Sequence, residues 1–522
     1  MKHHRRSSRA IYAAIVAFFS FGAAGSCGKE EDKPRRSDPP AAARNVLLVI
    51  IDTLHADKLG CYGNTLGLTP NIDAFARESF VFQQAFSHAP WTLPSTASLL
   101  TSCYPQQHGA GAKMKNGGPF DFEGLSPDVR TIAECFYDQG YDTAAIVNVF
   151  FLSKKYKMDR GFETHDYFDP PNKAKPVERR ATEISDWAID WIRKHQEKSD
   201  RPFFLMVHYF DPHMTYDPPV EYRKKFALSM DHQPDPTLFG TAQDVIKFRN
   251  GVIPASSIPI PRLEALYHAE IAYTDHEVGR LLAAVKESKL DEQTITVLTA
   301  DHGEEFMEHN GLEHGHTLYD ELIHVPLMMH NPELIQAGRS ALTVEHVDVA
   351  PTLCGLTGIQ TEHTFQGASL EKMLYAKTGK NRPIFSQGNM WGPILTAFRK
   401  DGFKFIDKSV GRELYDIIND PAERRNLVKE AQFVAKCDKL EADVKFLKEI
   451  YGKGRGISVP LTDAEKKHLA SLGYALGEAP SEDEDTAYDH DTATSARDNP
   501  STQPADNGAT SQPVEKAGDA HR

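Results

Sequence analysis

Val46-Leu47-Leu48-Val49-Ile50-Ile51 runs directly into Asp52 and Thr53, and this stretch decides the fold class. Continuous apolar, β-branched runs of this length are typical of strands buried on both faces of a parallel sheet. Two further runs also end in residues that can hold a metal ion: 294–300 before Asp301 and His302, and 203–209 before Asp211 and His213. In parallel sheets the binding crevice lies beyond the carboxyl ends of the strands. The three segments therefore predict a single metal-dependent active site.

Helical patterns alternate with these strands. Residues 184–192 place apolar side chains at helical spacing. Residues 263–289 form a longer helical pattern that leads into the apolar run 294–300. Strands that alternate with helices indicate an α/β fold. We therefore predict a doubly wound sandwich with a mainly parallel sheet.

The pattern changes after about residue 385. Short strand-like pieces at 394–399 and 403–406 flank Asp401-Gly402, which is a strong hairpin signal, and an amphipathic stretch follows at 434–450. These features predict a small C-terminal antiparallel sheet with a helix. A final helix is expected at 461–474, with Thr462 or Asp463 as its N-cap.

Composition bounds the class of protein. The 522 residues are 40% hydrophobic and 25% charged, which is ordinary for a globular protein with one large domain and an appendage. The formal charge of −14 argues against a nucleic-acid partner. The segment 476–522 holds 11 Asp and Glu against 3 Lys and Arg, so it carries −8 of that charge, and its composition predicts a disordered acidic tail.

The N-terminus predicts export. A basic start precedes the apolar run from Ala10 to Ala24, and Gly25-Ser26-Cys27 follows. Residues 1–27 therefore resemble a lipoprotein-type signal peptide, with Cys27 as the lipidated residue and 28–43 as a flexible tether. A plain signal peptide or an anchor helix is the alternative. We expect a bacterial lipoprotein of the cell envelope that faces the periplasm or the exterior.

The five other cysteines have no metal-type spacing. We expect isolated thiols, although a bridge between Cys61 and Cys103 is an alternative because both flank segments of the predicted site.

Thr92 introduces a candidate nucleophile. It comes just before Pro94 and a predicted helix, where free backbone N–H groups favour an anion. A hydroxyl becomes a good nucleophile only when a metal or a base lowers its pKa.

The segments that carry this chemistry resemble, in order, the motifs of the sulfatase family in the alkaline phosphatase superfamily. They are 45–63 with 69–73, 92–101, 299–304, 318–327, 346–353 and 413–427. The resemblance implies an alkaline-phosphatase-like fold, with a catalytic domain at 44–385 and a C-terminal α+β subdomain at 386–475.

The resemblance also assigns roles. It implies a metal held by Asp52, Thr92, Asp301 and His302, with Thr92 as the metal-activated nucleophile. It further implies that His213 is a general acid beside the leaving group, and that His314 contacts a substrate oxygen. His108, His208 and His324 are expected to be structural only.

Several positions depart from the family pattern. Threonine stands where sulfatases carry the cysteine or serine that becomes formylglycine, and threonine cannot form that aldehyde, so formylglycine is not expected. Thr96 replaces an arginine and Thr53 replaces a second aspartate. The lysine–histidine strand of the family is absent, and Phe150 and Phe151 lie in that region.

Losing a carboxylate while keeping an imidazole favours zinc or manganese, with calcium or magnesium as alternatives. A second metal site would form if Asp211, His213 and His314 converged. One metal and two metals both stay open.

These features predict a hydrolase that cleaves sulfuric or phosphoric ester bonds of an extracytoplasmic small-molecule, glycan or lipid substrate, by in-line attack from Thr92. One alternative is a phosphodiesterase, a phosphonate hydrolase or a phosphotransferase acting on envelope glycan or lipid. The other is a non-catalytic, sulfatase-like binding protein. The sequence makes no prediction of oligomeric state.

Overall fold

The structure is a computed structural model that describes residues 36–40, 43–115, 118–167, 180–226, 240–391, 393–408, 411–472 and 474. The predicted signal peptide, lipidated Cys27 and acidic tail lie outside these residues. Within the described part, no helix is both long enough and apolar enough to cross a bilayer.

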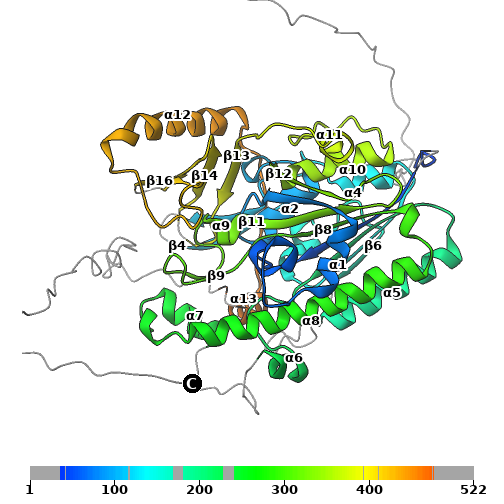
Figure 1. The fold of residues 1–522 in the computed structure, drawn as a ribbon, viewed down its shortest axis with the longest axis horizontal. Helices are drawn as coiled ribbons and strands as arrows, with labels where there is room; N and C mark the ends of the chain where they lie inside the picture. Colours follow the sequence, from blue (N-terminus) through cyan, green and yellow to red (C-terminus); the bar gives the residue numbers. More distant parts are fainter. Residues whose placement is uncertain are drawn as a thin grey trace, which may run out of the picture.

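A central sheet of eight strands organises the molecule (Figure 1). In spatial order its strands are β12 (Gly338–Glu345), β2 (Phe80–Phe86), β11 (His324–His330), β8 (Thr294–Ala300), β1 (Asn45–Ile51), β7 (Phe203–Tyr209), β5 (Asp142–Val147) and β6 (Thr164–Tyr167). Only β11 is antiparallel to its neighbours. The central strands β8, β1 and β7 are buried along their whole length, which explains their unbroken apolar sequences. The predicted mainly parallel α/β fold is confirmed.

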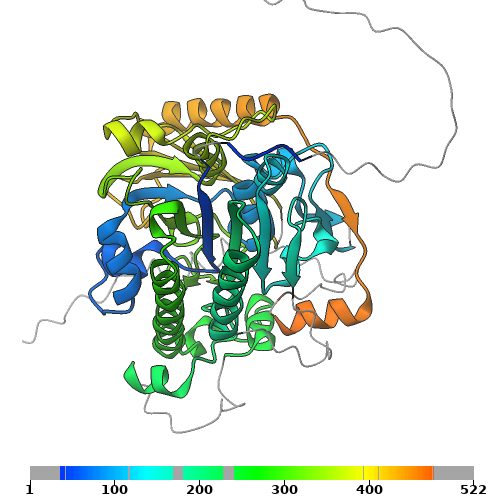
Figure 2. The same cartoon turned by 90° about the vertical axis from the view of Figure 1, so that its right-hand side faces the viewer.

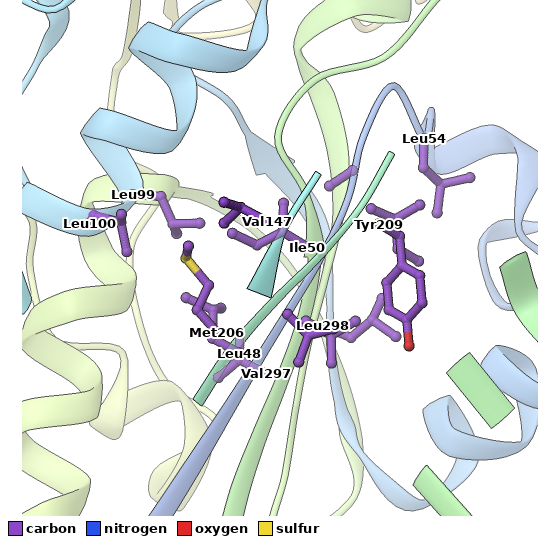
Figure 3. Packing of buried hydrophobic residues seen from close by; sticks show 14 of the residues in the cluster. Leu48, Ile50, Leu54, Leu99, Leu100, Val147, Met206, Tyr209, Val297 and Leu298 are labelled. Atoms are coloured by element: carbon purple, nitrogen blue, oxygen red, sulfur yellow. The ribbon is translucent and has the colours of Figure 1, made fainter. Parts of the chain in front are cut away.

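Helices cover both faces of this sheet. The long helices α5 (Ala181–Lys198) and α8 (Ile260–Glu287) lie side by side on one face, while α2 (Thr92–Thr101), α4 (Ile132–Asp138) and α10 (Val349–Thr357) lie on the other (Figures 1 and 2). Both long helices were predicted from their apolar spacing. Figure 3 shows Leu99 and Leu100 of α2 near Met206 of the sheet, in the core that fixes the position of this helix.

The C-terminal part forms its own small sheet. Strands β13 (Ile384–Gly388), β14 (Leu395–Lys400), β15 (Phe403–Asp407) and β16 (Arg412–Asp416) pair in order and antiparallel. Asp401 and Gly402 both have positive φ, as the predicted hairpin turn requires. Helix α12 (Val434–Ile450) packs against β14 and β15. The predicted antiparallel sheet with a helix is confirmed, and the predicted boundary at residue 385 falls inside β13.

The remaining elements are shorter. They are α1 (Pro70–Glu78), α3 (Pro105–His108), β3 (Gly111–Lys115), β4 (Gly118–Gly124), α6 (Val220–Lys225), α7 (Ala242–Arg249), β9 (Glu305–Phe306), β10 (Leu312–Glu313), α9 (Asp320–Ile323) and α11 (Glu371–Ala376).

The five cysteines of the described residues are free, so the predicted isolated thiols are confirmed and the Cys61–Cys103 bridge is wrong.

The last described segment returns to the main domain. Strand β17 (Ile457–Val459) pairs with β4, and α13 (Asp463–Ser471) contacts α7. The hydroxyl of Thr462 accepts from the backbone N–H of Glu465, which confirms the predicted N-cap. Tyr474 follows this helix and donates its backbone N–H to the carbonyl of Leu469.

Candidate metal centre and active site

Strand register builds the floor of the site. The last residue of β1 is paired with the last residue of β7 on one side and with the last residue of β8 on the other. Asp52 and Asp301, which follow β1 and β8, therefore leave the sheet side by side. His208 is the penultimate residue of β7, and because side chains alternate along a strand it faces the same side as Asp52.

These side chains converge and are completely buried. His208 Nε2 lies 3.8 Å from Asp52 Oδ2 and 3.8 Å from Asp301 Oδ2. His302 Nε2 lies 3.3 Å from Asp52 Oδ1 and 3.7 Å from Asp301 Oδ2. Among the described residues, Asp52, His208 and Asp301 are the one group whose ligand atoms all lie within 4.8 Å of one another.

The hydrogen-bond inventory indicates that a cation belongs here. Both carboxylate oxygens of Asp52, Oδ2 of Asp301 and both ring nitrogens of His208 are buried without a hydrogen-bond partner. Leaving charged oxygens in that condition is costly, and native proteins seldom do so. A divalent ion would satisfy these atoms together, so the donor set fits a metal.

Neighbouring backbone groups orient the ligands. The Nδ1–H of His302 donates to the carbonyl oxygen of Gly303 at 2.9 Å, which turns Nε2 toward the carboxylates. Asp301 Oδ1 accepts from the backbone N–H groups of His302 (2.8 Å) and Thr53 (3.3 Å). Its other oxygen therefore remains for a metal. The backbone of Thr53 thus supports the site at the position where the family has a second aspartate.

The charges of this cluster are strongly coupled. Burial lowers the pKa of His302, but the carboxylates of Asp301 and Asp52 outweigh it and raise that pKa to about 9. Burial raises the pKa of Asp301, whereas His302 and His208 bring it below its ordinary value. In the metal-free protein, a proton on His302 thus compensates part of the charge that a cation would neutralise.

Thr92, the predicted nucleophile, lies beside the candidate metal ligands. It is the first residue of α2, it is fully buried, and its Oγ1 is 3.3 Å from His302 Nε2. Because Pro94 has no N–H and Ser95 already donates to the carbonyl of Trp91, the N–H groups of Thr92 and Leu93 remain at this end of the helix. The structure therefore places a hydroxyl, a helix N-terminus and the candidate metal ligands together.

His213 and His314 lie beside this centre, 4.8 Å apart between ring centroids. His213 Nδ1 donates to the carbonyl of Met214, and its Nε2 is 2.8 Å from the hydroxyl of Tyr474. His314 Nδ1 is 2.9 Å from Glu304 Oε1, and its Nε2 is 3.2 Å from the same hydroxyl. Tyr474 thus bridges the two predicted catalytic histidines.

One interpretation from the sequence needs correction, and one residue of this region was missed. His208 was assigned a structural role only, yet it belongs to the converging group. The signal was a histidine in an otherwise apolar strand, at the position that pairs with Ile50 and so shares a face with Asp52. Tyr474 was missed because nothing near it in sequence predicts chemistry.

The structure does not support a second metal on Asp211, His213 and His314. Asp211 Oδ2 accepts from the backbone N–H of Ala181, at the first residue of α5, and thereby caps that helix. Burial raises the pKa of Asp211 to about 6, against the opposing effect of Arg180. Its carboxylate serves the helix terminus, so a single metal centre is the arrangement that the geometry carries.

The departures from the family pattern make this region apolar. Phe150 and Phe151 are buried, and the ring of Phe151 lies 5.3 Å from that of Trp91 beside the start of α2. Thr96 is also buried, and its hydroxyl has no hydrogen-bond partner. Aromatic packing therefore occupies the region where the family carries its lysine–histidine strand.

Comparison with known proteins decides the family. A model of the sulfatase family matches residues 44–359, and a model described as the C-terminal region of N-sulphoglucosamine sulphohydrolase matches residues 308–449. The chain belongs to the sulfatase family. It is an ester hydrolase of that family, with the alkaline-phosphatase-like fold that its sheet order and helices display.

Individual relatives have low sequence identity to this chain but align with most of its length. An arylsulfatase of Clostridium perfringens is 23% identical over 79% of this chain and 95% of its own length. A human iduronate 2-sulfatase is 29% identical over 61% of this chain and 70% of its own length.

Solved structures share the fold. A phosphonate monoester hydrolase of Agrobacterium radiobacter aligns with a TM-score of 0.62 at 20% identity, covering 78% of this chain and 96% of that one. A protein solved with its substrate D-glucosamine-2-N,6-O-disulfate aligns with a TM-score of 0.64 at 20% identity, covering 78% of this chain and 98% of that one.

Proposed function

We propose that this sulfatase-family protein cleaves sulfuric or phosphoric ester bonds by in-line attack of Thr92, without formylglycine. The observation that carries the proposal is the position of the Thr92 hydroxyl, 3.3 Å from His302 Nε2 within the candidate metal cluster. The family nucleophile position is therefore filled by an unmodified alcohol that faces the ligand set. A degenerate binding protein would have no need to keep this many buried ligand atoms directed at one point.

A divalent cation held by Asp52, His208, Asp301 and His302 would lower the pKa of the Thr92 hydroxyl and neutralise charge on the ester oxygens. The mixed carboxylate and imidazole donors favour zinc or manganese over calcium or magnesium.

The protein groups would divide the remaining work. The N–H groups at the start of α2 would bind the anionic oxygens of the ester, because a helix N-terminus favours negative charge. Thr92 would lose its hydroxyl proton to solvent, and its Oγ1 would form the new bond to sulfur or phosphorus as the bond to the departing alcohol breaks on the opposite side. His213 would give that alcohol a proton from Nε2. The same nitrogen would then take a proton from water, whose oxygen attacks sulfur or phosphorus and breaks its bond to Thr92 Oγ1.

Sulfate and phosphate esters place different demands on this scheme. Formylglycine enzymes release their product by elimination, whereas an ester on Thr92 must be hydrolysed directly. This requirement favours phosphoric or phosphonic esters. We also propose export, with lipidation of Cys27, and an extracytoplasmic small-molecule, glycan or lipid substrate.

A parallel assay tests the proposal. Aryl sulfate, phosphate monoester, phosphate diester and phosphonate ester are supplied to the protein with zinc, manganese or neither. Thr92→Ala should lose turnover on the order of 10³-fold or more, because nothing replaces the attacking oxygen. Thr92→Ser keeps that oxygen and should remain active.

Circular dichroism should show that both variants keep the fold. Full activity in Thr92→Ala would remove the nucleophile from the scheme. Product that appears only with an added acceptor alcohol would identify transfer in place of hydrolysis.

A further inference from the structure

The reactive atoms of the candidate site are enclosed by protein. Asp52, Thr92, Asp301 and His302 are wholly buried, and His213 and His314 are each 2% exposed. An ester whose alcohol portion extends away from the reacting centre cannot reach Thr92 in this arrangement. A part of the enclosure must therefore move before substrate binds.

Tyr474 is the part of the enclosure that contacts the candidate catalytic atoms. Its hydroxyl is 2.8 Å from His213 Nε2 and 3.2 Å from His314 Nε2, the nitrogens assigned to the leaving-group and substrate oxygens. While it is in place, neither nitrogen can contact an ester. The phenol also resembles chemically what it displaces, since it is an alcohol oxygen between two imidazoles.

The electrostatic setting keeps this hydroxyl neutral. Burial, together with the nearby carboxylates led by Asp52, raises the pKa of Tyr474 far above its ordinary value. The phenol therefore remains a hydrogen-bonding alcohol, as the released product of an ester would be.

The segment that carries Tyr474 is built from short elements, which Leu469 and Leu472 anchor in the main core. Strand β17 contributes three residues to an edge sheet, and α13 is nine residues long. The ring of Tyr474 packs on Trp391 at 6.4 Å and on Phe151 at 5.1 Å between centroids. Short terminal elements can open locally while the central sheet stays folded, and opening here would expose Leu469, Leu472 and the ring of Tyr474.

We propose that Tyr474 is a residue of the active site that occupies the leaving-group position in the closed state, and that movement of β17 and α13 withdraws it when an oxyanion ester binds. This inference rests on the proposed function for the class of ligand. An ester must therefore compete with the Tyr474 hydroxyl for His213 and His314. The position of the C-terminal segment thus controls whether these two histidines are free to bind substrate.

Tyr474→Phe tests the inference in the full-length, manganese-loaded protein. The substitution keeps the ring contacts and removes the competing hydroxyl. Tyr156→Phe is the matched control, because Tyr156 packs in the same aromatic cluster and its buried hydroxyl has no hydrogen-bond partner. The probe is inorganic phosphate, and its dissociation constant is measured by isothermal titration calorimetry.

Tyr474→Phe should bind phosphate about tenfold more tightly, because up to two hydrogen bonds no longer compete with the ligand, while Tyr156→Phe should match the wild type. For any ester that is turned over, KM should fall by a similar factor while kcat is kept. Unchanged or weaker phosphate binding overturns the inference. A fall in kcat does so too, because it would make Tyr474 the proton donor.

Trp391 provides a second measurement on an otherwise unaltered protein. Phosphate should change the fluorescence of the wild type as Tyr474 leaves the indole, and Trp391→Phe should lose that change. Phosphate binding without a Trp391 signal, or no binding in any variant, overturns the inference. If no ester is turned over by the wild type, the proposed function fails, while the phosphate titrations still decide the position of Tyr474.

Discussion

His208 places an imidazole at the penultimate position of an otherwise apolar strand, and both of its ring nitrogens are buried without a partner. A buried imidazole without a hydrogen-bond partner destabilises the fold unless it binds a ligand, and beside two carboxylates that ligand would be a cation. Its equal distances to Asp52 and Asp301 favour the second interpretation. At this scale, unsatisfied atoms identify chemistry better than motif positions do.

His208→Ala should weaken zinc or manganese binding on the order of 100-fold, because it removes an imidazole from the converging group. Competition with a chromogenic chelator measures this affinity. His324→Gln is a suitable control, since that histidine bonds the carbonyl of Gln83 outside the cluster. Equal metal affinity in His208→Ala and the wild type would return His208 to a structural role.

Metal uptake should release a proton from His302. In the metal-free protein the pKa of this histidine is about 9, above the ordinary 6.5, so the ring is protonated at pH 7 and must lose that proton to bind a cation. The release should therefore be present at pH 7 and should vanish as the pH rises through about 9, with apparent affinity increasing over that interval.

Calorimetric titrations of metal, in buffers with different ionisation enthalpies at pH 7 and pH 9.5, measure this release. The same number of protons at both values would contradict the assignment of a raised pKa to His302.

At the scale of elements, the sequence predicted the strands and turns whose formation depends on residues close together along the chain. The apolar runs of β1, β7 and β8 lie where they were predicted, because strands covered on both faces must be apolar throughout. The Asp401-Gly402 turn and the Thr462 cap were also predicted, since each depends on residues a few positions apart.

Other features of the elements depend on distant partners. The reversed direction of β11 and the helix-capping role of Asp211 follow from what lies beside them in space. Pairing of this kind leaves no periodic trace in one chain, so the sequence could not predict it.

At the scale of the whole molecule, the site draws on three strands, one helix N-terminus and the far C-terminal segment. The candidate site therefore gathers residues from nearly the whole described chain, and Tyr474 encloses it from the C-terminal side. A C-terminal truncation before β17 would remove an edge strand and part of the enclosure together.

The N-terminal prediction also belongs to the whole molecule. Cys27→Ala should move the protein from the membrane fraction to the soluble fraction of a bacterial host and abolish its labelling by a radioactive fatty acid, because a thiol is required for lipidation. Turnover should be unchanged, since Cys27 precedes the catalytic domain. A membrane-bound, unlabelled Cys27→Ala variant would favour the anchor-helix alternative.

The sequence alone determined the sulfatase-family fold, the order of its motifs and the candidate positions of Asp52, Thr92, Asp301 and His302. These depend on apolar runs and on residues adjacent to strand ends, which are visible along a single chain. Only the tertiary structure showed that His208 and Tyr474 belong to the site and that Asp211 bonds the first residue of α5 instead. The physical reason is that strand register and side-chain direction fix which buried polar atoms meet, and both are set by pairing between segments hundreds of residues apart.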